Sequence, residues 1–457
     1  MVKTCLAVCG VPLFSTFFHL FSSRGLSWSG TGLKGKSKLD LLQGLLLCFL
    51  SCVFSGAAQP VLAPPPTEFS QTNLVTLPLS GTNQLATNEV GLTTLVPTSS
   101  QRLLDFGPIH IHPHPFYRFS YGNGIQAQPG QQTKTAVNEF SPGVLIELGT
   151  HWRLDYTPTL RFYSSSRFKD GTDHSVALNG GTSYQDWRLG LSQAYSSSSQ
   201  PLVETGGQTD QENYSTSVSA GYQINNAMSL EVGVSQNLRF VGASVATEQL
   251  SDSRDWSTME WLSYHAWSKF SLGLGVGGGY TDVQVGSDMT YEQLQGRIQW
   301  QPGEKLTFSL NGGFEDRQFL DSRVPNVVNP IFGCAVSYHL FDQTTISLNA
   351  SRTVSASYFA RQVTESTSIG VGIRQRFFGK LFFDIGAGYG TTSYGATETG
   401  ETVSRGDTYE NATFRLGFAF LKDGTASLFY NWSHNSSSDA GFSYYSNQAG
   451  MELGYRF

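Results

Sequence analysis

Hydrophobic and polar residues alternate along the chain from about Phe116 onward. In residues 306–315, one side of the predicted strand carries two leucines and two phenylalanines, while the other carries Thr, Ser, Asn, Gly and Glu. Residues 381–389 and 413–420 divide in the same way. Successive side chains of a β-strand point to opposite faces, so this pattern predicts amphipathic strands.

The lengths of these segments favour strands that cross a membrane. Many amphipathic runs exceed ten residues, the length that a tilted membrane strand needs. Tight polar turns alternate with long polar loops, as in an up-and-down barrel. The predicted fold is all-β: a transmembrane antiparallel up-and-down β-barrel of about 18 strands, with 16 as the alternative count. A β-sandwich shows the same alternation, but its strands are usually shorter.

The chain before the strands divides into two predicted regions. Residues 1–58 contain a basic stretch, a short apolar run and small residues, which indicate an export signal with a long lead-in. A mis-assigned start codon would explain that lead-in, and Cys52 leaves a lipid anchor as an alternative. Residues 59–115 are expected to be a flexible periplasmic segment or a plug, and residues 116–457 the outer-membrane barrel.

Composition and charge narrow the class of protein. Only 14% of the residues are charged, while glycine accounts for 49 of 457 positions. Removal of the export signal leaves 24 Lys and Arg against 34 Asp and Glu, a net charge of −10, which argues against nucleic-acid binding. Cys334 would be the one cysteine of the mature chain, so an intramolecular disulfide is not expected.

The two faces of the predicted strands suggest different roles. Charged residues on the polar face would line the interior of the barrel: Arg153, Asp155, Glu231, Asp384, Arg374, Arg376, Arg415 and Arg456. The last segment has an apolar face that ends in an aromatic residue: Met451, Leu453, Tyr455 and Phe457. This C-terminal pattern resembles the assembly signal of bacterial outer-membrane proteins, and the resemblance implies recognition of the terminal Phe by the outer-membrane insertion machinery.

A family resemblance extends over roughly residues 116–457. It is carried by Trp-Arg-Leu-Asp-Tyr-Thr-Pro-Thr at 152–159, Ser-Leu-Phe-Tyr-Asn-Trp-Ser-His-Asn-Ser at 427–436, Phe-Ser-Tyr-Tyr-Ser at 442–446 and the segment 450–457. These stretches resemble the putative beta-barrel porin type 2 family, which includes barrels associated with exopolysaccharide or capsule systems. The resemblance implies an outer-membrane β-barrel in a diderm bacterium.

Two histidine patterns are candidates for chemistry. His110, His112 and His114 alternate and could bind a transition metal, but Pro113 and Pro115 interrupt them, and a periplasmic lead-in is the preferred interpretation.

His434 and Ser436 partly resemble the His-x-Ser-Asn element of outer-membrane lipid deacylases, in which Ser is the nucleophile and His its base. Ser437 replaces the Asn of that pattern. A polar loop entrance explains the same residues without chemistry.

The predicted function is therefore a porin-like passive channel for small hydrophilic solutes, without catalysis or a cofactor. The alternative is a structural or assembly barrel that serves surface polysaccharide export, and a lipid hydrolase is a more distant alternative. The expected partners are outer-membrane lipid and lipopolysaccharide, the insertion machinery and, for the alternative function, polysaccharide export components.

Overall fold

The computed structural model describes residues 104–456 apart from 243–248, 321–322, 402 and 422. Every described residue belongs to a single compact unit. The predicted export signal, residues 59–103 of the predicted periplasmic segment and the terminal Phe457 lie outside the described residues.

The described residues form nineteen β-strands and one short 3-10 helix. These elements are β1 (Leu104–Phe106), β2 (Ile109–Gln128), β3 (Gln131–Leu148), β4 (Trp152–Tyr163), β5 (Gly171–Tyr184), β6 (Trp187–Leu202), β7 (Gly207–Asn225), β8 (Met228–Val241), β9 (Ser253–Trp267), β10 (Phe270–Val283), β11 (Met289–Trp300), β12 (Leu306–Phe319), β13 (Val327–Phe341), β14 (Thr344–Ala356), β15 (Gln362–Phe377), β16 (Leu381–Ala396), β17 (Gly406–Phe420), β18 (Gly424–Ser437), η2 (Ala440–Phe442) and β19 (Tyr444–Tyr455).

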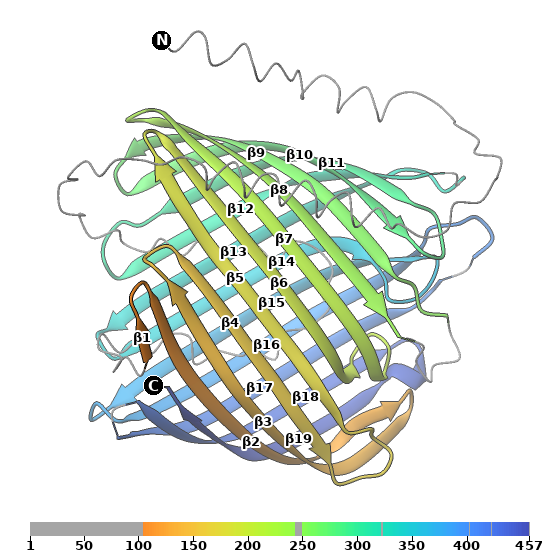
Figure 1. Ribbon diagram of the computed structural model, residues 1–457. Helices are drawn as coiled ribbons and strands as arrows, with labels where there is room; N and C mark the ends of the chain where they lie inside the picture. The colour runs from red at the N-terminus through yellow and green to blue at the C-terminus, as the bar shows by residue number, and fades with distance from the viewer. Residues whose placement is uncertain (1–103, 243–248, 321–322, 402, 422, 457) are drawn as a thin grey trace. The chain divides into compact units, whose positions relative to one another are not determined.

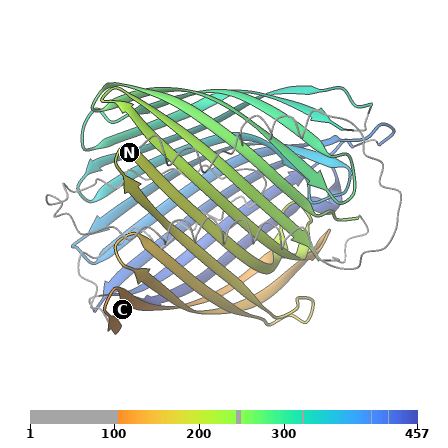
Figure 2. The same cartoon turned by 45° about the horizontal axis from the view of Figure 1, so that its top comes forward.

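Strands β2 to β19 form a closed antiparallel barrel of 18 strands (Figures 1 and 2). Each strand pairs with the next along the chain, and β19 closes the wall by pairing with β2 from Phe116↔Gly454 to Asn123↔Asn447. The blue C-terminal strands accordingly lie beside the orange β2 in Figure 1. β1 is a short addition that pairs with the start of β2. The predicted fold and the count of 18 are confirmed.

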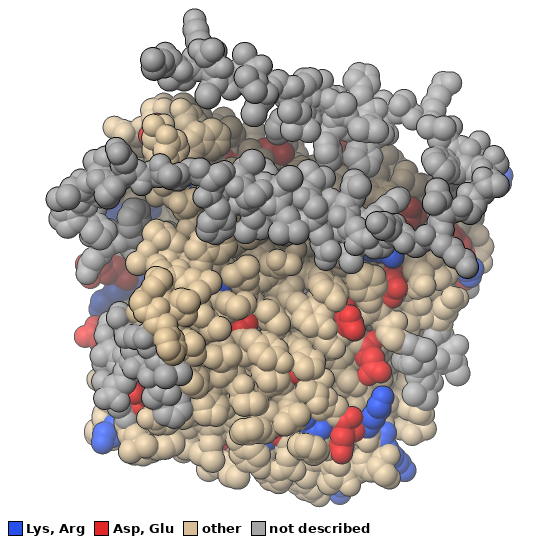
Figure 3. Space-filling model, in the orientation of Figure 1, with Lys and Arg blue, Asp and Glu red and all other residues tan. Residues whose placement is uncertain are grey.

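The outward face of the wall is apolar. Leu274, Val276, Phe314 and Leu428 are between 53% and 63% exposed, as expected for side chains that face lipid. In Figure 3, charged side chains gather toward two opposite edges of the visible face, with a mostly uncharged expanse between them. Within the part of the chain that the structure describes, no helix is long and apolar enough to cross a membrane.

The first wall strand begins at Ile109, so the predicted boundary at residue 116 is wrong by seven residues. The two prolines, Pro113 and Pro115, had argued against a strand here. Both prolines point to the edge of β2 that pairs with β1 and with β19. On this edge β1 pairs with β2 only as far as Ile111, and β19 pairs with it only from Phe116 onward, so neither of these described strands pairs with the two prolines. Proline is tolerated at such an edge because its missing N–H leaves no described partner unsatisfied.

The predicted tight turns are present, but one predicted long loop is not. Residues 196–211, expected to form a loop, lie mostly in a β6–β7 hairpin that stays in register from Ser196↔Asn213 to Leu202↔Gly207. The polar composition of this stretch is that of a hairpin extending beyond the apolar band, where both strand faces meet water or other loops.

Candidate channel lumen and outer mouth

The inward face of the wall carries charges that are paired rather than free. Glu452 on β19 is 5% exposed and lies between two arginines from other strands. Its carboxylate is 3.2 Å from Arg415 Nε and 3.7 Å from Arg118 Nε, and it accepts a hydrogen bond of 3.0 Å from the Ser427 hydroxyl. Burial of a carboxylate is costly unless its oxygens have oppositely charged partners and accept hydrogen bonds.

The structure places three more of the predicted lining residues in similar pairs. Arg374 Nε lies 2.7 Å from Asp384 Oδ1, directly across the β15–β16 ladder. Glu231 is 3.2 Å from Arg297. These four charges therefore give the lumen little net field.

The remaining predicted residues lie toward the turn end of the barrel. Arg153 pairs with Glu147 at 3.3 Å, and Asp155 Oδ2 lies 3.2 Å from His114 Nε2. Arg456, just after β19, lies within electrostatic reach of Asp155. Arg376 is exposed near the end of β15.

Inward aromatic rings lie flat against the wall because glycines on the next strand leave room for them. Gly275 faces Trp261 across the β9–β10 ladder, and a Cβ added to Gly275 would lie 2.6 Å from the Trp261 ring. The Arg297 guanidinium stacks on this ring, 4.0 Å from its centroid. The same close approach occurs between Phe429 and Gly450. The glycines therefore leave space for neighbouring aromatic rings to lie against the wall, so these side chains extend only a short way into the lumen.

At the loop end of the barrel, a buried carboxylate joins two hairpins. Glu204, in the turn between β6 and β7, is 2% exposed. Its Oε1 accepts hydrogen bonds from the Ser357 hydroxyl at 2.6 Å and from the Tyr358 backbone N–H at 2.8 Å. Ser357 and Tyr358 belong to the β14–β15 connection, residues 357–361, which lies far from β6 and β7 along the wall.

Further contacts hold Tyr358. Its hydroxyl donates to Gln211 Oε1 at 2.7 Å, and the Arg239 guanidinium lies 4.0 Å from its ring centroid. Arg239 also donates to the Ala356 and Ser357 carbonyls. Burial raises the pKa of the Tyr358 phenol, so the hydroxyl stays a hydrogen-bond donor.

Arg405, which precedes β17, joins a third part of the mouth to this cluster. Its Nη1 donates to the Glu204 carbonyl at 2.8 Å, and its guanidinium lies 3.6 Å from the Phe442 ring centroid. Phe442 meets Phe359 edge to face at 5.9 Å. Sequence reasoning missed these residues. The one available signal was a pair of aromatic residues, Tyr358 and Phe359, in a stretch rich in serine.

The two histidine patterns have ordinary structural partners. His112 Nε2 lies 3.7 Å from Glu147. Among the described residues, no cluster of three His, Cys, Asp or Glu has a geometry that could hold a metal. His434 Nδ1 lies 3.7 Å from the carboxylate of Glu410 on the neighbouring strand β17. The contact sits on the outward face, opposite the paired lumen charges.

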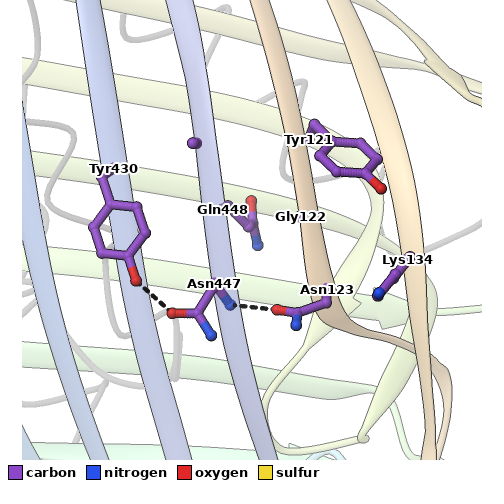
Figure 4. A pocket seen from close by; sticks show the side chains of 8 residues that line it. Tyr121, Gly122, Asn123, Lys134, Tyr430, Asn447 and Gln448 are labelled. Carbon is purple, nitrogen blue, oxygen red and sulfur yellow. Dashed lines mark hydrogen bonds between the residues drawn. The ribbon is translucent and has the colours of Figure 1, made fainter.

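A groove of about 240 Å³ lies on the outward side of the seam between β19 and β2. Figure 4 shows Tyr430 donating to the Asn447 side chain and the Asn447 backbone N–H donating to Asn123, with Lys134 near by. The groove is separate from the lumen because Tyr121 and Tyr430, which line it, are on the exposed outer face.

An 18-strand wall with an apolar outside and a polar inside is the architecture of an outer-membrane barrel. Residues 285–457 match the family model described as Putative beta-barrel porin 2. This match confirms the family resemblance over that part of the chain, which is similar to porin-like outer-membrane barrels. A search of curated proteins finds no significant match.

Three solved structures among those similar to the barrel come from pseudomonads. The outer membrane protein OpdK of Pseudomonas aeruginosa is 12% identical, with 76% of this chain and 98% of that chain covered and a TM-score of 0.42. OccK2 (OpdF) of Pseudomonas aeruginosa, in complex with glucuronate, is 13% identical with the same coverage and TM-score. A BenF-like porin of Pseudomonas fluorescens Pf-5 is 10% identical, with 76% and 99% covered and a TM-score of 0.43.

Proposed function

We propose that this barrel is a passive channel for small hydrophilic solutes. The observation that carries the proposal is the inward face, on which aromatic rings lie flat over glycines and charged side chains are tied to one another along the wall. A barrel of 18 strands is wide enough to hold water along its axis when its lining is thin.

We also propose that the channel discriminates little between cations and anions. Acidic residues in the outer connections would attract cations if they were free, but three of them are already paired. Asp407 is bound by Arg405, while Glu398 and Glu401 both bind Arg361, with N–O distances of 3.2 and 3.0 Å. Paired charges produce a weak field at the mouth. Uncharged polar solutes such as sugars fit this lining as well as ions do.

Planar-bilayer recording and liposome swelling test the channel. The purified mature chain should give stepwise ion conductance, and vesicles that contain it should swell in small sugars more readily than in large ones. Heat-denatured protein is the control. A folded barrel that passes neither ions nor sugars, both as the natural chain and after the contacts of residues 357–361 at the mouth are removed, would overturn the proposal.

One observation favours the second candidate, a structural or assembly barrel for surface polysaccharide export. Side chains from distant hairpins meet across the outer mouth, and such a cover would suit a barrel that carries no flux. That candidate gains support if every folded variant fails to conduct. We further propose that neither role is enzymatic: among the described contacts, none joins His434 to Ser436 as a base must join its nucleophile.

A further inference from the structure

We infer that residues 357–361 form a stopper that narrows the outer mouth of the barrel, and that the Glu204 carboxylate is its latch. The inference rests on the proposed channel function, because it concerns what limits flow through the same lumen. It assigns to the β14–β15 connection a role in setting conductance and the size of solute that passes.

The positions of the two hairpins show that the contact spans the lumen. β6 and β14 are eight strands apart in a ring of 18, which is nearly halfway round. A circular wall of strands about 4.8 Å apart and tilted by about 40° is roughly 35 Å across. The Glu204 and Ser357 side chains nevertheless meet at 2.6 Å. The hairpins that carry them must therefore lean inward to meet over the lumen.

On its β14 side the β14–β15 hairpin separates from the wall before its tip, while β15 stays paired with β16 as far as Gln362↔Ala396. β14 stays paired with β15 as far as Ala356↔Val363, but its described pairing with β13 ends at Arg352. Val354, Ala356 and Val363 share the side of the hairpin that faces lipid lower down, yet they are only 4–8% exposed.

These three residues belong to an apolar cluster with Met289 and Phe319, which lie on the inward faces of β11 and β12. The outer side of the hairpin tip thus rests on the inner side of the wall. This arrangement arises only if the tip is bent into the mouth.

Burial at the tip is unusual for a barrel connection. Ser357, Tyr358 and Phe359 are 1–3% exposed, whereas connecting segments normally lie on the surface. Polar and backbone contacts account for much of this packing. The backbone of the tip bonds to the β8–β9 connection through Ser251 N–H and Tyr358 O, at 2.9 Å, and to the β10–β11 connection through Arg361 N–H and Val285 O, at 3.1 Å.

Glu204 is the group whose loss should release the stopper. Its carboxylate accepts hydrogen bonds from the Ser357 hydroxyl and the Tyr358 N–H, and its backbone carbonyl accepts one from Arg405. Replacement by Ala would leave the Tyr358 N–H without this buried acceptor, which is more costly than removing both partners. If the hairpin leans outward, the Tyr358 N–H can donate to water instead. The variant should therefore favour the open mouth.

The first test compares single-channel conductance of the wild type, Glu204→Ala and Glu212→Ala. Glu212 is the matched control, because it is an exposed carboxylate on the same hairpin, near Tyr214 and away from the stopper. Glu204→Ala should raise conductance several-fold and admit larger sugars in liposome swelling, while Glu212→Ala should behave as the wild type. Equal conductance of folded wild type and Glu204→Ala would overturn the stopper and leave the channel standing.

A second test holds even if Glu204→Ala fails to fold. Leu250 and Phe359 face each other in an antiparallel bridge, a spacing that a disulfide can span. Leu250→Cys/Phe359→Cys in a Cys334→Ser background should conduct weakly when oxidised and several-fold more after reduction, because Phe359 no longer packs on Phe442. High conductance that is unchanged between the two states would refute the stopper. Silence of every folded variant would refute the channel proposal itself.

Discussion

Replacing Leu416 by Arg tests the division of the wall into lipid and water faces. Leu416 on β17 is 46% exposed and pairs with Phe383 and Leu428, both on the apolar side. It lies four residues from Phe420, the last residue of β17 before the turn. Four residues of about 3.3 Å in a strand tilted by about 40° cover ~10 Å along the membrane normal, close to the middle of an apolar band about 25 Å tall.

An Arg at that depth should cost about 2–4 kcal/mol in the free energy of folding into a bilayer. This penalty corresponds to a ~30-fold to several-hundred-fold shift in the folding equilibrium constant, at about 1.4 kcal/mol per tenfold. The matched control is Thr413→Arg, three residues away on the inward face, between Gly386 and Asn431. There the guanidinium can reach the water of the lumen, and Gly386, which has no side chain, leaves space for it.

The assay is reversible folding into lipid vesicles, titrated with denaturant and followed by the gel shift between heated and unheated barrel. Leu416→Arg should lower the midpoint markedly, and Thr413→Arg should leave it near that of the wild type. If the two variants lose equal stability, or if Thr413→Arg is the less stable of the two, the outward and inward faces have been assigned incorrectly.

Three further results are expected. Tyr358 should hold the stopper fully below pH about 10, the ordinary tyrosine value, and lose its hold as pH rises through the pKa that burial has raised; conductance should thus rise only in strong alkali, and Tyr358→Phe should abolish that step. Arg415→Ala should shift the reversal potential in a salt gradient toward cation preference, because it removes one of the two arginines beside Glu452, and Glu452→Gln should shift it toward anions, because both arginines lose their carboxylate; identical potentials would place these charges outside the conduction path. Deleting Phe457 should reduce membrane-inserted barrel without reducing export if the proposed insertion machinery reads that residue, and unchanged insertion would contradict this role.

The fold could be predicted because alternation repeats in every wall strand and each repeat carries the same information. The inward placement of Arg374 and Asp384 follows from the same rule, since they lie opposite each other across one ladder. Alternation gives the face of a residue and says nothing about which residues on distant strands meet. The contact between Glu204 and Ser357 joins positions 153 residues apart, so no local pattern announces it.

Packing on the inward face also escapes a rule based on residue type. Gly417 alternates with lipid-facing residues, and its small size suggests that serine would be tolerated there. In the structure the Phe382 ring covers it, and an added Cβ would lie 2.0 Å from the ring. A glycine that admits water and a glycine that admits a neighbouring ring look the same in the sequence.

The seam between β2 and β19 has a consequence for how the protein is made. It joins Phe116 to Gly454, 338 residues apart, through eight registered pairs, fewer than any other ladder between neighbouring wall strands in the described residues. Contacts at such separation form slowly, because closing the intervening loop costs entropy before any bond forms. Until β19 arrives, β2 presents an open edge to any passing strand. The nascent barrel is therefore most prone to aggregation before it closes. Closure, which removes this edge, depends on only eight pairs between β19 and β2.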